Sequence, residues 1–364
     1  MASISFKRGV GDEFKKSKKM LTNKIIITER LNINVRQFRT AGTPVIFIHG
    51  NASSSVFWDE TMKALPDGFW GIAPDLRGYG DTEDKLIDAT KGFGDWVEDL
   101  QALTAVLGIE KYHIIGHSLG GAFVFSMIAA ESERVLSATL VNPGSPFGFG
   151  GTKDEKGTLC FEDFAGSGGG IVNPEFARLM GEKDRSTDNP QASPRVVMNS
   201  FYWKPPFVPT NEDDLLTSLL SQKVGANRYP GDFEPSTNYP FVKPGKYGPL
   251  NAASPKYIGD TINHFINANS KPSILWVRGA EDQIVSDNSL FDFGTLGKMG
   301  LIPNYPGEAV VPSQPMVSQT RYVLEQYQSN GGTYEEVIMD NTAHSPYIEK
   351  PTEFNTLFHK QLSK

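Results

Sequence analysis

The sequence has very little cysteine, which limits the kinds of site that it can hold. Cys160 is the single cysteine among 364 residues, so an internal disulfide and a metal site built from several cysteines are both excluded. A protein without disulfides suits a reducing compartment. We therefore expect a cytoplasmic protein in which Cys160 is simply a small apolar residue.

Long hydrophobic runs are also missing. No stretch reaches the roughly 20 consecutive apolar residues that a helix needs to cross a bilayer. Residues 1–22 form a basic lead without the apolar core of a secretory signal, although they carry Lys7, Arg8, Lys15, Lys16, Lys18 and Lys19. The sequence therefore predicts neither a membrane protein nor an exported one.

An excess of positive charge is absent as well. The formal net charge is -7, and no long basic run occurs, which argues against a nucleic-acid partner or an anionic membrane surface. The hydrophobic fraction of 39% and the 23 phenylalanines supply ample material for a packed core. We expect a folded protein, and the charge balance by itself selects no partner.

Short apolar runs alternate with helical patterns over much of the chain. Such alternation predicts an α/β fold with a doubly wound, mostly parallel sheet, in which sites form at the carboxyl ends of the strands. The expected strands are Lys24–Thr28, Leu31–Phe38, Pro44–Ile48, Phe69–Ala73, Tyr112–Ile115, Leu136–Val141, Ser273–Val277 and Tyr334–Met339. The expected core helices are Phe93–Leu107, Leu119–Glu131, Met316–Gln328 and Thr352–Leu362.

This alternation stops in the middle of the chain. Residues 143–271 are rich in glycine, proline and aromatic side chains, and they contain helix-like pieces at Pro174–Gly181, Glu212–Val224 and Lys256–Asn267. We interpret them as a cap inserted into a core made of residues 23–142 and 272–364, with a smaller insertion at Ser289–Pro315. Aromatic cap residues can line a pocket or pack the cap onto the core: Phe201, Tyr202, Trp203, Phe207, Tyr229, Phe233, Tyr239 and Tyr247.

A serine lies between two glycines where one expected strand meets its helix. The segment Gly116-His117-Ser118-Leu119-Gly120 directly follows the apolar run Tyr112–Ile115. A strand that ends in G-x-S-x-G and enters a helix is typical of a nucleophile elbow, which exposes the serine hydroxyl on a strained turn. Taken alone, the pentapeptide is equally compatible with an ordinary glycine-rich turn.

A nucleophilic serine needs a general base and an acid that orients the base. His344 follows the last expected strand in a loop, from which it can reach Ser118, and Asp282 lies at a strand end between the two in chain order. Glu281 is the rival acid. Ordinary packing or hydrogen-bonding roles are expected for His49, His113, His117, His264 and His359, although His49 can also shape the neighbouring loop.

Acyl transfer also needs two hydrogen-bond donors for the oxygen that becomes negative. Such donors are commonly the backbone N–H after the nucleophile and one in the loop after an early strand, which here are Leu119 and Asn51. Ala52 is the alternative to Asn51, because a shift of one residue in this loop cannot be read from sequence.

Together these motifs resemble the α/β-hydrolase superfamily, in particular its capped, esterase-like members. The resemblance rests on His49-Gly50, Asp75-Leu76-Arg77-Gly78-Tyr79-Gly80, Gly116-His117-Ser118-Leu119-Gly120-Gly121, Gly279-Ala280-Glu281-Asp282-Gln283-Ile284-Val285 and His344-Ser345-Pro346. It implies an eight-stranded, mostly parallel core, a Ser118/His344/Asp282 triad, and no cofactor or metal. The cap itself resembles no family that we can name.

The reaction expected from these residues is cleavage of a carboxylic ester or lactone through an acyl-enzyme on Ser118, with apolar or aromatic substrate groups under the cap. Cleavage of a carbon-carbon, amide or thioester bond remains open, as does a ligand-binding protein that turns over slowly. The loop His49-Gly50-Asn51 is also similar to that of haloalkane dehalogenases. Those enzymes use an aspartate nucleophile, and a serine alkyl ether could not be hydrolysed, so we exclude dehalogenation and epoxide opening.

Overall fold

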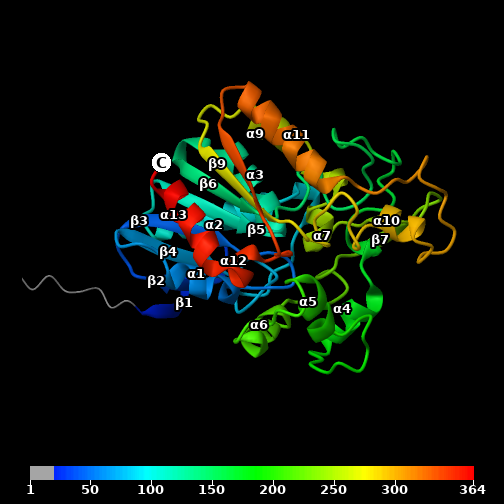
Figure 1. Cartoon of the computed structure of the whole chain (residues 1–364), viewed down its shortest axis with the longest axis horizontal. Coiled ribbons are helices and arrows are strands. Elements are labelled where there is room, and N and C mark those ends of the chain that lie inside the picture. Colours follow the sequence, from blue (N-terminus) through cyan, green and yellow to red (C-terminus); the bar gives the residue numbers. More distant parts are fainter. Residues whose placement is uncertain (1–19) are drawn as a thin grey trace, which may run out of the picture.

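A twisted eight-stranded sheet forms the centre of this computed structural model, which describes residues 20–364 (Figure 1). The strand order is β1-β2-β4-β3-β5-β6-β9-β10. β2 pairs antiparallel with β1 and β4, and the other pairs are parallel. The strands are β1 (Leu21–Ile27), β2 (Asn32–Phe38), β3 (Thr43–Ile48), β4 (Phe69–Pro74), β5 (Tyr112–His117), β6 (Val135–Val141), β9 (Ser273–Gly279) and β10 (Tyr334–Met339).

The predicted fold class is confirmed, and the predicted strands differ from the observed ones mainly at their ends. The central strands β3 and β5 are apolar runs because helices cover both of their faces. β1 begins at Leu21, before the predicted Lys24, since its exposed polar positions gave little signal. The basic lead predicted for residues 1–22 falls mostly on residues 1–19, which lie outside the described part of the chain.

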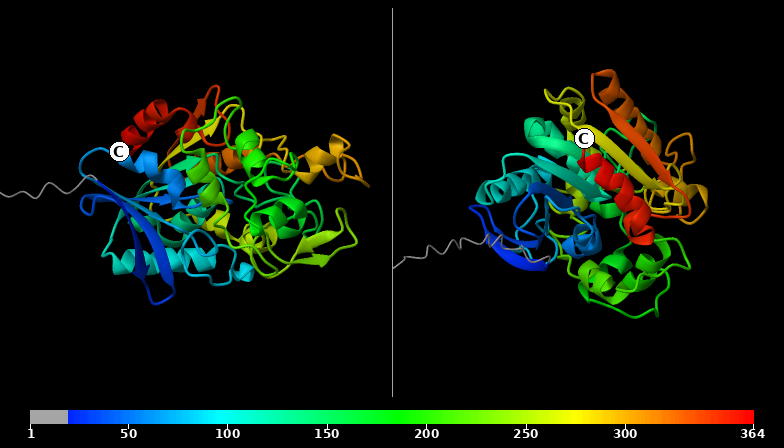
Figure 2. Two further views of the ribbon diagram at one scale, coloured as in Figure 1. Left: turned by 90° about the horizontal axis from the view of Figure 1, so that it is seen from below. Right: turned by 60° about the vertical axis from the view of Figure 1, so that its left-hand side comes forward.

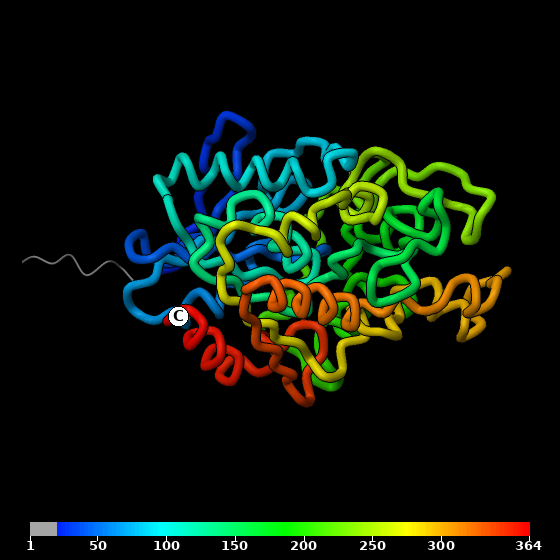
Figure 3. The backbone as a smooth tube through the Cα atoms, turned by 90° about the horizontal axis from the view of Figure 1, so that it is seen from above, coloured from blue at the N-terminus to red at the C-terminus, as the bar shows by residue number. Residues whose placement is uncertain are grey.

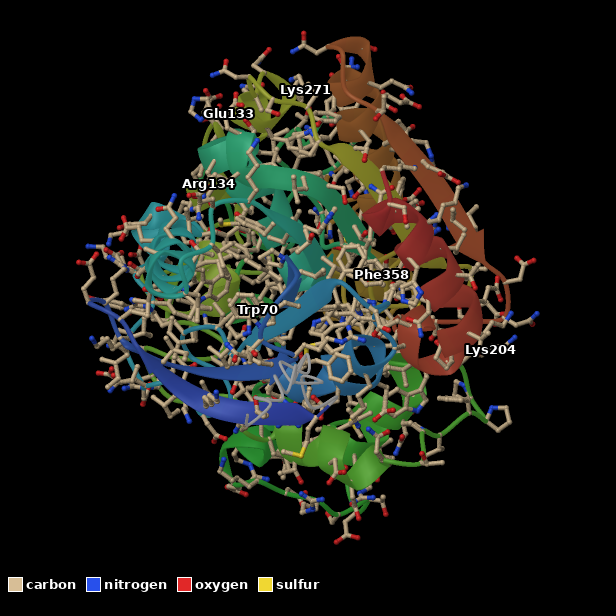
Figure 4. All side chains as sticks on the ribbon, turned by 90° about the vertical axis from the view of Figure 1, so that its left-hand side faces the viewer. Trp70, Glu133, Arg134, Lys204, Lys271 and Phe358 are labelled. Carbon is tan, nitrogen blue, oxygen red and sulfur yellow. The ribbon has the colours of Figure 1, made fainter. Side chains whose placement is uncertain are left out.

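Two helical layers cover the sheet (Figure 2). On one face, an apolar cluster joins α2, α3, α9 and α11 through Trp96, Phe123, Phe265 and Tyr327. On the other face, Trp58 and the C-terminal helices form a second cluster, which includes Phe358 (labelled in Figure 4). The core helices are α1 (Asp59–Lys63), α2 (Gly94–Val106), α3 (Leu119–Glu131), α9 (Thr261–Ile266), α11 (Met316–Ser329), α12 (Pro346–Glu349) and α13 (Pro351–Leu362). α10 (Phe293–Lys298) lies away from the sheet, within the predicted insertion Ser289–Pro315 (Figure 1).

Most of the segment between β6 and β9 gathers at the end of the molecule opposite the C-terminus, as the green part of the tube in Figure 3 shows. It has its own apolar cluster, built on Met198, Trp203 and Leu216, which also takes in Ala52 and Phe57 from the core. Its elements are α4 (Pro174–Gly181), α5 (Pro194–Phe201), α6 (Glu212–Leu219), β7 (Phe233–Pro235), β8 (Val242–Pro244), α7 (Pro249–Ala252) and α8 (Pro255–Ile258). The sequence pattern did not predict α5 or the β7-β8 pair.

α9 belongs to the helical layer of the core, although it precedes β9. Its Phe265 ring contacts Phe125 of α3 edge to face and stacks on Tyr327 of α11. Gly259, with φ of 56°, ends α8 and separates it from α9, so the predicted helix Lys256–Asn267 is interrupted. We propose that the segment from the end of β6 to α8 forms the inserted cap, which thus ends before α9 and short of the predicted residue 271. Among residues 20–364, no helix combines the length and apolar character that crossing a bilayer requires.

Candidate active site

Ser118 lies on a sharp turn between β5 and α3. Its φ of 55° and ψ of -121° place a non-glycine residue in a backbone region that L residues rarely adopt. A Cβ on Gly116 would collide with the carbonyl oxygen of Gly120, and a Cβ on Gly120 would collide with the carbonyl oxygen of His49. The two glycines therefore allow strand, helix and loop to meet closely enough to support this conformation.

His344 and Asp282 meet at the carboxyl ends of β10 and β9. His344 Nδ1 lies 2.7 Å from Asp282 Oδ2, and both side chains are almost fully buried. The other carboxylate oxygen, Oδ1, accepts the backbone N–H groups of Ile284 at 2.8 Å and Val285 at 3.1 Å. A carboxylate held in this way accepts the Nδ1 proton of the imidazole, which leaves Nε2 free to receive a proton from another group.

Glu281 occupies a different environment from Asp282. Its side chain is 46% exposed, and its carboxylate forms an ion pair of 2.6 Å with Lys204, which lies at the molecular surface in Figure 4. The structure thus brings Asp282, and not its neighbour, against His344.

The loop after β3 provides the other side of the site. Leu119 is the first residue of α3, so its N–H has no acceptor within the helix. Asn51 and Ala52 both line the same cavity as Ser118, but the N–H of Ala52 already donates to Gln222 Oε1 at 3.0 Å. His49 shapes this loop: its Nδ1 bonds the carbonyl oxygen of Gly50 at 2.8 Å, and its Nε2 accepts the N–H of Leu76 at 3.0 Å.

A cavity of about 350 Å³ contains Ser118, His344, Asn51 and Leu119 in its wall. The remaining wall is dominated by apolar side chains from the cap, from α3 and from the segment after Asp282. No Asp, Glu, Lys or Arg belongs to the described wall. The aromatic residues in it are Phe93, Phe149, Phe176, Phe201, Tyr202, Tyr229, Phe291 and Phe293.

Three of the cap aromatics that the sequence singled out, Phe201, Tyr202 and Tyr229, line this cavity. Trp203 instead packs in the interior of the cap, and Phe233 is exposed. Among residues 20–364, no group of three or more His, Cys, Asp or Glu side chains is placed to hold a metal ion.

Asn142, at the end of β6, is a residue that the sequence reasoning passed over because it searched this strand end for a carboxylate. Its Nδ2 donates to the carbonyl oxygens of His344 at 2.8 Å and Ala343 at 3.1 Å, while its Oδ1 accepts the N–H of Gly279 at 3.1 Å. One amide therefore connects the loop of the histidine to the strand that leads to Asp282. The position of Asn142 at a strand end beside the elbow is the feature of the sequence that could have identified it as a residue of the site.

His117, next to Ser118, also supports the histidine loop. Its Nε2 lies 2.8 Å from the carbonyl oxygen of His344, which requires a proton on that nitrogen. Burial, with a further contribution from His344, lowers the pKa of His117 well below its ordinary value. Burial also lowers the pKa of His49 and takes the pKa of His113 to about 4.

These buried histidines predict that stability falls with acidification. An unfolded histidine has a pKa near 6.5, so the unfolded chain binds protons first as the pH drops, and stability is lost from about pH 6.5 downward. Each such group contributes up to about 1.4 kcal/mol per pH unit. Urea unfolding at pH 7 and pH 5 should show a lower free energy of unfolding at pH 5, and a smaller drop in His113→Gln.

His264 offers the matched control, because its side chain is 70% exposed. His264→Gln should show the same drop as the native chain. Equal stability of the native chain at both pH values would contradict the assignment of neutral buried histidines.

Comparisons with known proteins agree with this architecture. Residues 43–305 match the family model described as alpha/beta hydrolase fold, so the chain belongs to that hydrolase family. It is 36% identical over 85 residues to a soluble epoxide hydrolase from Corynebacterium sp., a match that covers 23% of this chain and 29% of that protein. The curated relatives are thus matched over only about a third of their length.

Two solved structures match nearly the whole chain at low identity. A putative aryl esterase from Burkholderia cenocepacia has a TM-score of 0.57 and 16% identity, over 94% of this chain and 100% of that one. A 2-hydroxy-6-oxo-6-phenylhexa-2,4-dienoate hydrolase from Rhodococcus sp. strain RHA1 has a TM-score of 0.58 and 14% identity, over 95% and 99%. At such identities the likeness shows the shared fold.

Proposed function

We propose that the protein is a serine hydrolase that cleaves uncharged carboxylic esters or lactones, with Ser118 as nucleophile, His344 as general base and Asp282 as the acid that orients the base. The observation that carries this proposal is the buried hydrogen bond between Asp282 and His344, in a cavity whose wall also contains Ser118 on its strained turn. The family supports hydrolysis as the reaction class.

In the proposed reaction, Ser118 Oγ attacks the carbonyl carbon of the substrate, and His344 Nε2 takes the hydroxyl proton of the serine at the same time. The carbonyl oxygen becomes negative and is held by the N–H groups of Leu119 and Asn51. When the tetrahedral intermediate collapses, the proton on His344 passes to the departing alkoxide, which leaves as the alcohol. Water then attacks the acyl-enzyme and gives a proton to His344. His344 returns this proton to Ser118 Oγ as the carboxylic acid departs, which restores the serine hydroxyl and the neutral imidazole.

Relatives that open epoxides do not alter this choice of substrate. A serine oxygen that attacked an epoxide or haloalkane carbon would form an alkyl ether, which water cannot cleave as it cleaves an ester. Acyl carbon is therefore the electrophile that a serine at this elbow can attack and later release.

Carbon-carbon hydrolysis is the second candidate, because one structural neighbour is named for a dienoate substrate, which carries a carboxylate. The cavity wall of this chain offers no described cation to such a group. Burying an unpaired carboxylate is costly, so the wall favours an uncharged substrate with apolar or aromatic groups.

A matched pair of substrates tests this choice. We expect kcat/KM for phenyl butyrate to exceed that for the singly charged phenyl half-ester of succinic acid by about 100-fold, which is about 2.7 kcal/mol of transition-state stabilisation. The two acyl groups are similar in size, so their charge is the main difference. Dihydrocoumarin is included as a lactone substrate. The measurement is the initial rate of hydrolysis as a function of substrate concentration.

A dienoate with a vinylogous diketone serves as the comparison compound. If this compound were cleaved faster than every ester and lactone, carbon-carbon hydrolysis would replace ester hydrolysis as the proposed reaction. Repeated product release distinguishes a catalyst from a receptor-like protein, which would stop near one equivalent.

A further inference from the structure

The cap is hydrogen-bonded to the loop that follows β3, at the residues which the proposed function assigns to the oxyanion. Gln222, from the cap segment after α6, is buried at 3% exposure. Its Oε1 accepts the N–H of Ala52 at 3.0 Å, and its Nε2 donates to Asn51 Oδ1 at 3.0 Å. One cap side chain thus holds two successive residues of the loop.

Tyr202, at the C-terminal end of α5, holds the same loop through its carbonyl groups. Its hydroxyl lies 3.0 Å from the carbonyl oxygen of Ala52 and 3.3 Å from that of Asn51. Its ring lines the cavity and faces the His344 ring edge to face, with the centroids 6.1 Å apart.

The core contributes a third contact to this loop. Tyr79, which is fully buried, donates its hydroxyl to Asn51 Oδ1 at 3.0 Å. Ala52 adopts a φ of 46°, a conformation that is unfavourable for alanine and therefore needs support from its surroundings. The polar groups of Asn51 and Ala52 are thus bonded mainly by residues distant in sequence.

We propose that Gln222 and Tyr202 are positioning residues, through which the cap fixes the oxyanion loop and reserves the Asn51 N–H for the substrate oxygen. Gln222 occupies the Ala52 N–H, so that the competing donor of the loop is withdrawn. This inference rests on the proposed function. It gives the cap two roles, which are to cover the cavity and to position the oxyanion loop. Neither residue reacts with the substrate; each acts through Asn51 and Ala52.

The test uses Gln222→Leu and Tyr202→Phe in the full chain with phenyl butyrate as substrate. Losing one oxyanion donor typically costs about 10²- to 10³-fold in rate, and a loosened donor costs less. We expect each variant to lower kcat by about 10- to 100-fold while KM changes by less than about 2-fold, because the contact matters only when the oxygen carries charge.

A transition-state analogue gives the second readout. A trifluoromethyl ketone forms an adduct with Ser118 that carries an oxyanion, so its inhibition constant should rise in parallel with the fall in kcat. Ser221→Ala is the matched control, because Ser221 neighbours Gln222 but its hydroxyl donates within its own turn, to the carbonyl oxygen of Ser218. It should leave kcat, KM and inhibition unchanged.

Two results would overturn this inference. One is that the variants fold and keep the native kcat. The other is that KM rises while kcat stays constant, which would show that the two residues contribute to substrate binding and not to stabilisation of the oxyanion. If Gln222→Leu fails to fold, Tyr202→Phe decides, since it removes a single hydroxyl. Failure of the native chain to hydrolyse any ester would instead refute the proposed function, so the two failures are distinguishable.

Discussion

Replacement of Ser118 by alanine is expected to lower kcat for phenyl butyrate by roughly 10⁶-fold, which is the usual loss when the nucleophile of a serine hydrolase triad is removed. The reason is chemical: no other group in the described cavity wall combines a hydroxyl on a strained turn with a neighbouring Asp-His pair. The measurement is steady-state hydrolysis, together with covalent labelling by a fluorophosphonate probe, which Ser118→Ala should abolish.

The same substitution within α3, which follows Ser118, provides the control for this experiment. Ser126 lies two turns further along the helix and outside the cavity wall. Ser126→Ala should retain both labelling and hydrolysis. Labelling that persists in Ser118→Ala would show that another residue is the nucleophile, and the proposed mechanism would then be abandoned.

Asp282→Asn carries the second large effect, an expected loss of about 10⁴-fold in kcat with little change in fold. The amide of an asparagine can donate a hydrogen bond to Nδ1 of His344, which favours the wrong tautomer of the imidazole, with its proton on Nε2. The loss should therefore appear in kcat, measured with the same ester, while circular dichroism and thermal unfolding confirm that the variant is folded.

Glu281→Gln is the paired control, because it makes the same chemical change one residue away. Glu281 contacts Lys204 at the surface, and an exposed ion pair of this kind is worth less than about 1 kcal/mol. We expect near-native kcat in this variant. If kcat fell in Glu281→Gln and not in Asp282→Asn, the acid of the triad would have been assigned to the wrong residue.

Local sequence patterns predicted most of the core. β10 is found at Tyr334–Met339 and α3 at Leu119–Glu131, as expected, because each is a local run of residues suited to its element. α3 follows the elbow motif and is buried from Leu119 to Ile128, and β10 packs Val337 and Met339 against the core. The cap was less predictable. α5 is eight residues long, which is about two turns, and β7 and β8 are three residues each, so all three are short for a period to stand out.

The sequence by itself determined the order of the chemistry-bearing residues, with a serine in an elbow and a histidine and acids at later strand ends, because motifs and strand ends are local features. It left open which of Asp282 and Glu281 meets His344. Adjacent residues in a loop differ in direction, and only the packed loop shows Asp282 facing inward.

Tertiary structure likewise decided the state of the loop at Asn51 and Ala52, because Gln222 and Tyr202 reach it from positions about 150 to 170 residues away. The bond between Asn142 and the histidine loop spans 202 residues, and no local pattern records such a partner. Hydrogen bonds of this kind depend on how separate elements come together in space, and for that reason the support of the site became visible only in the folded chain.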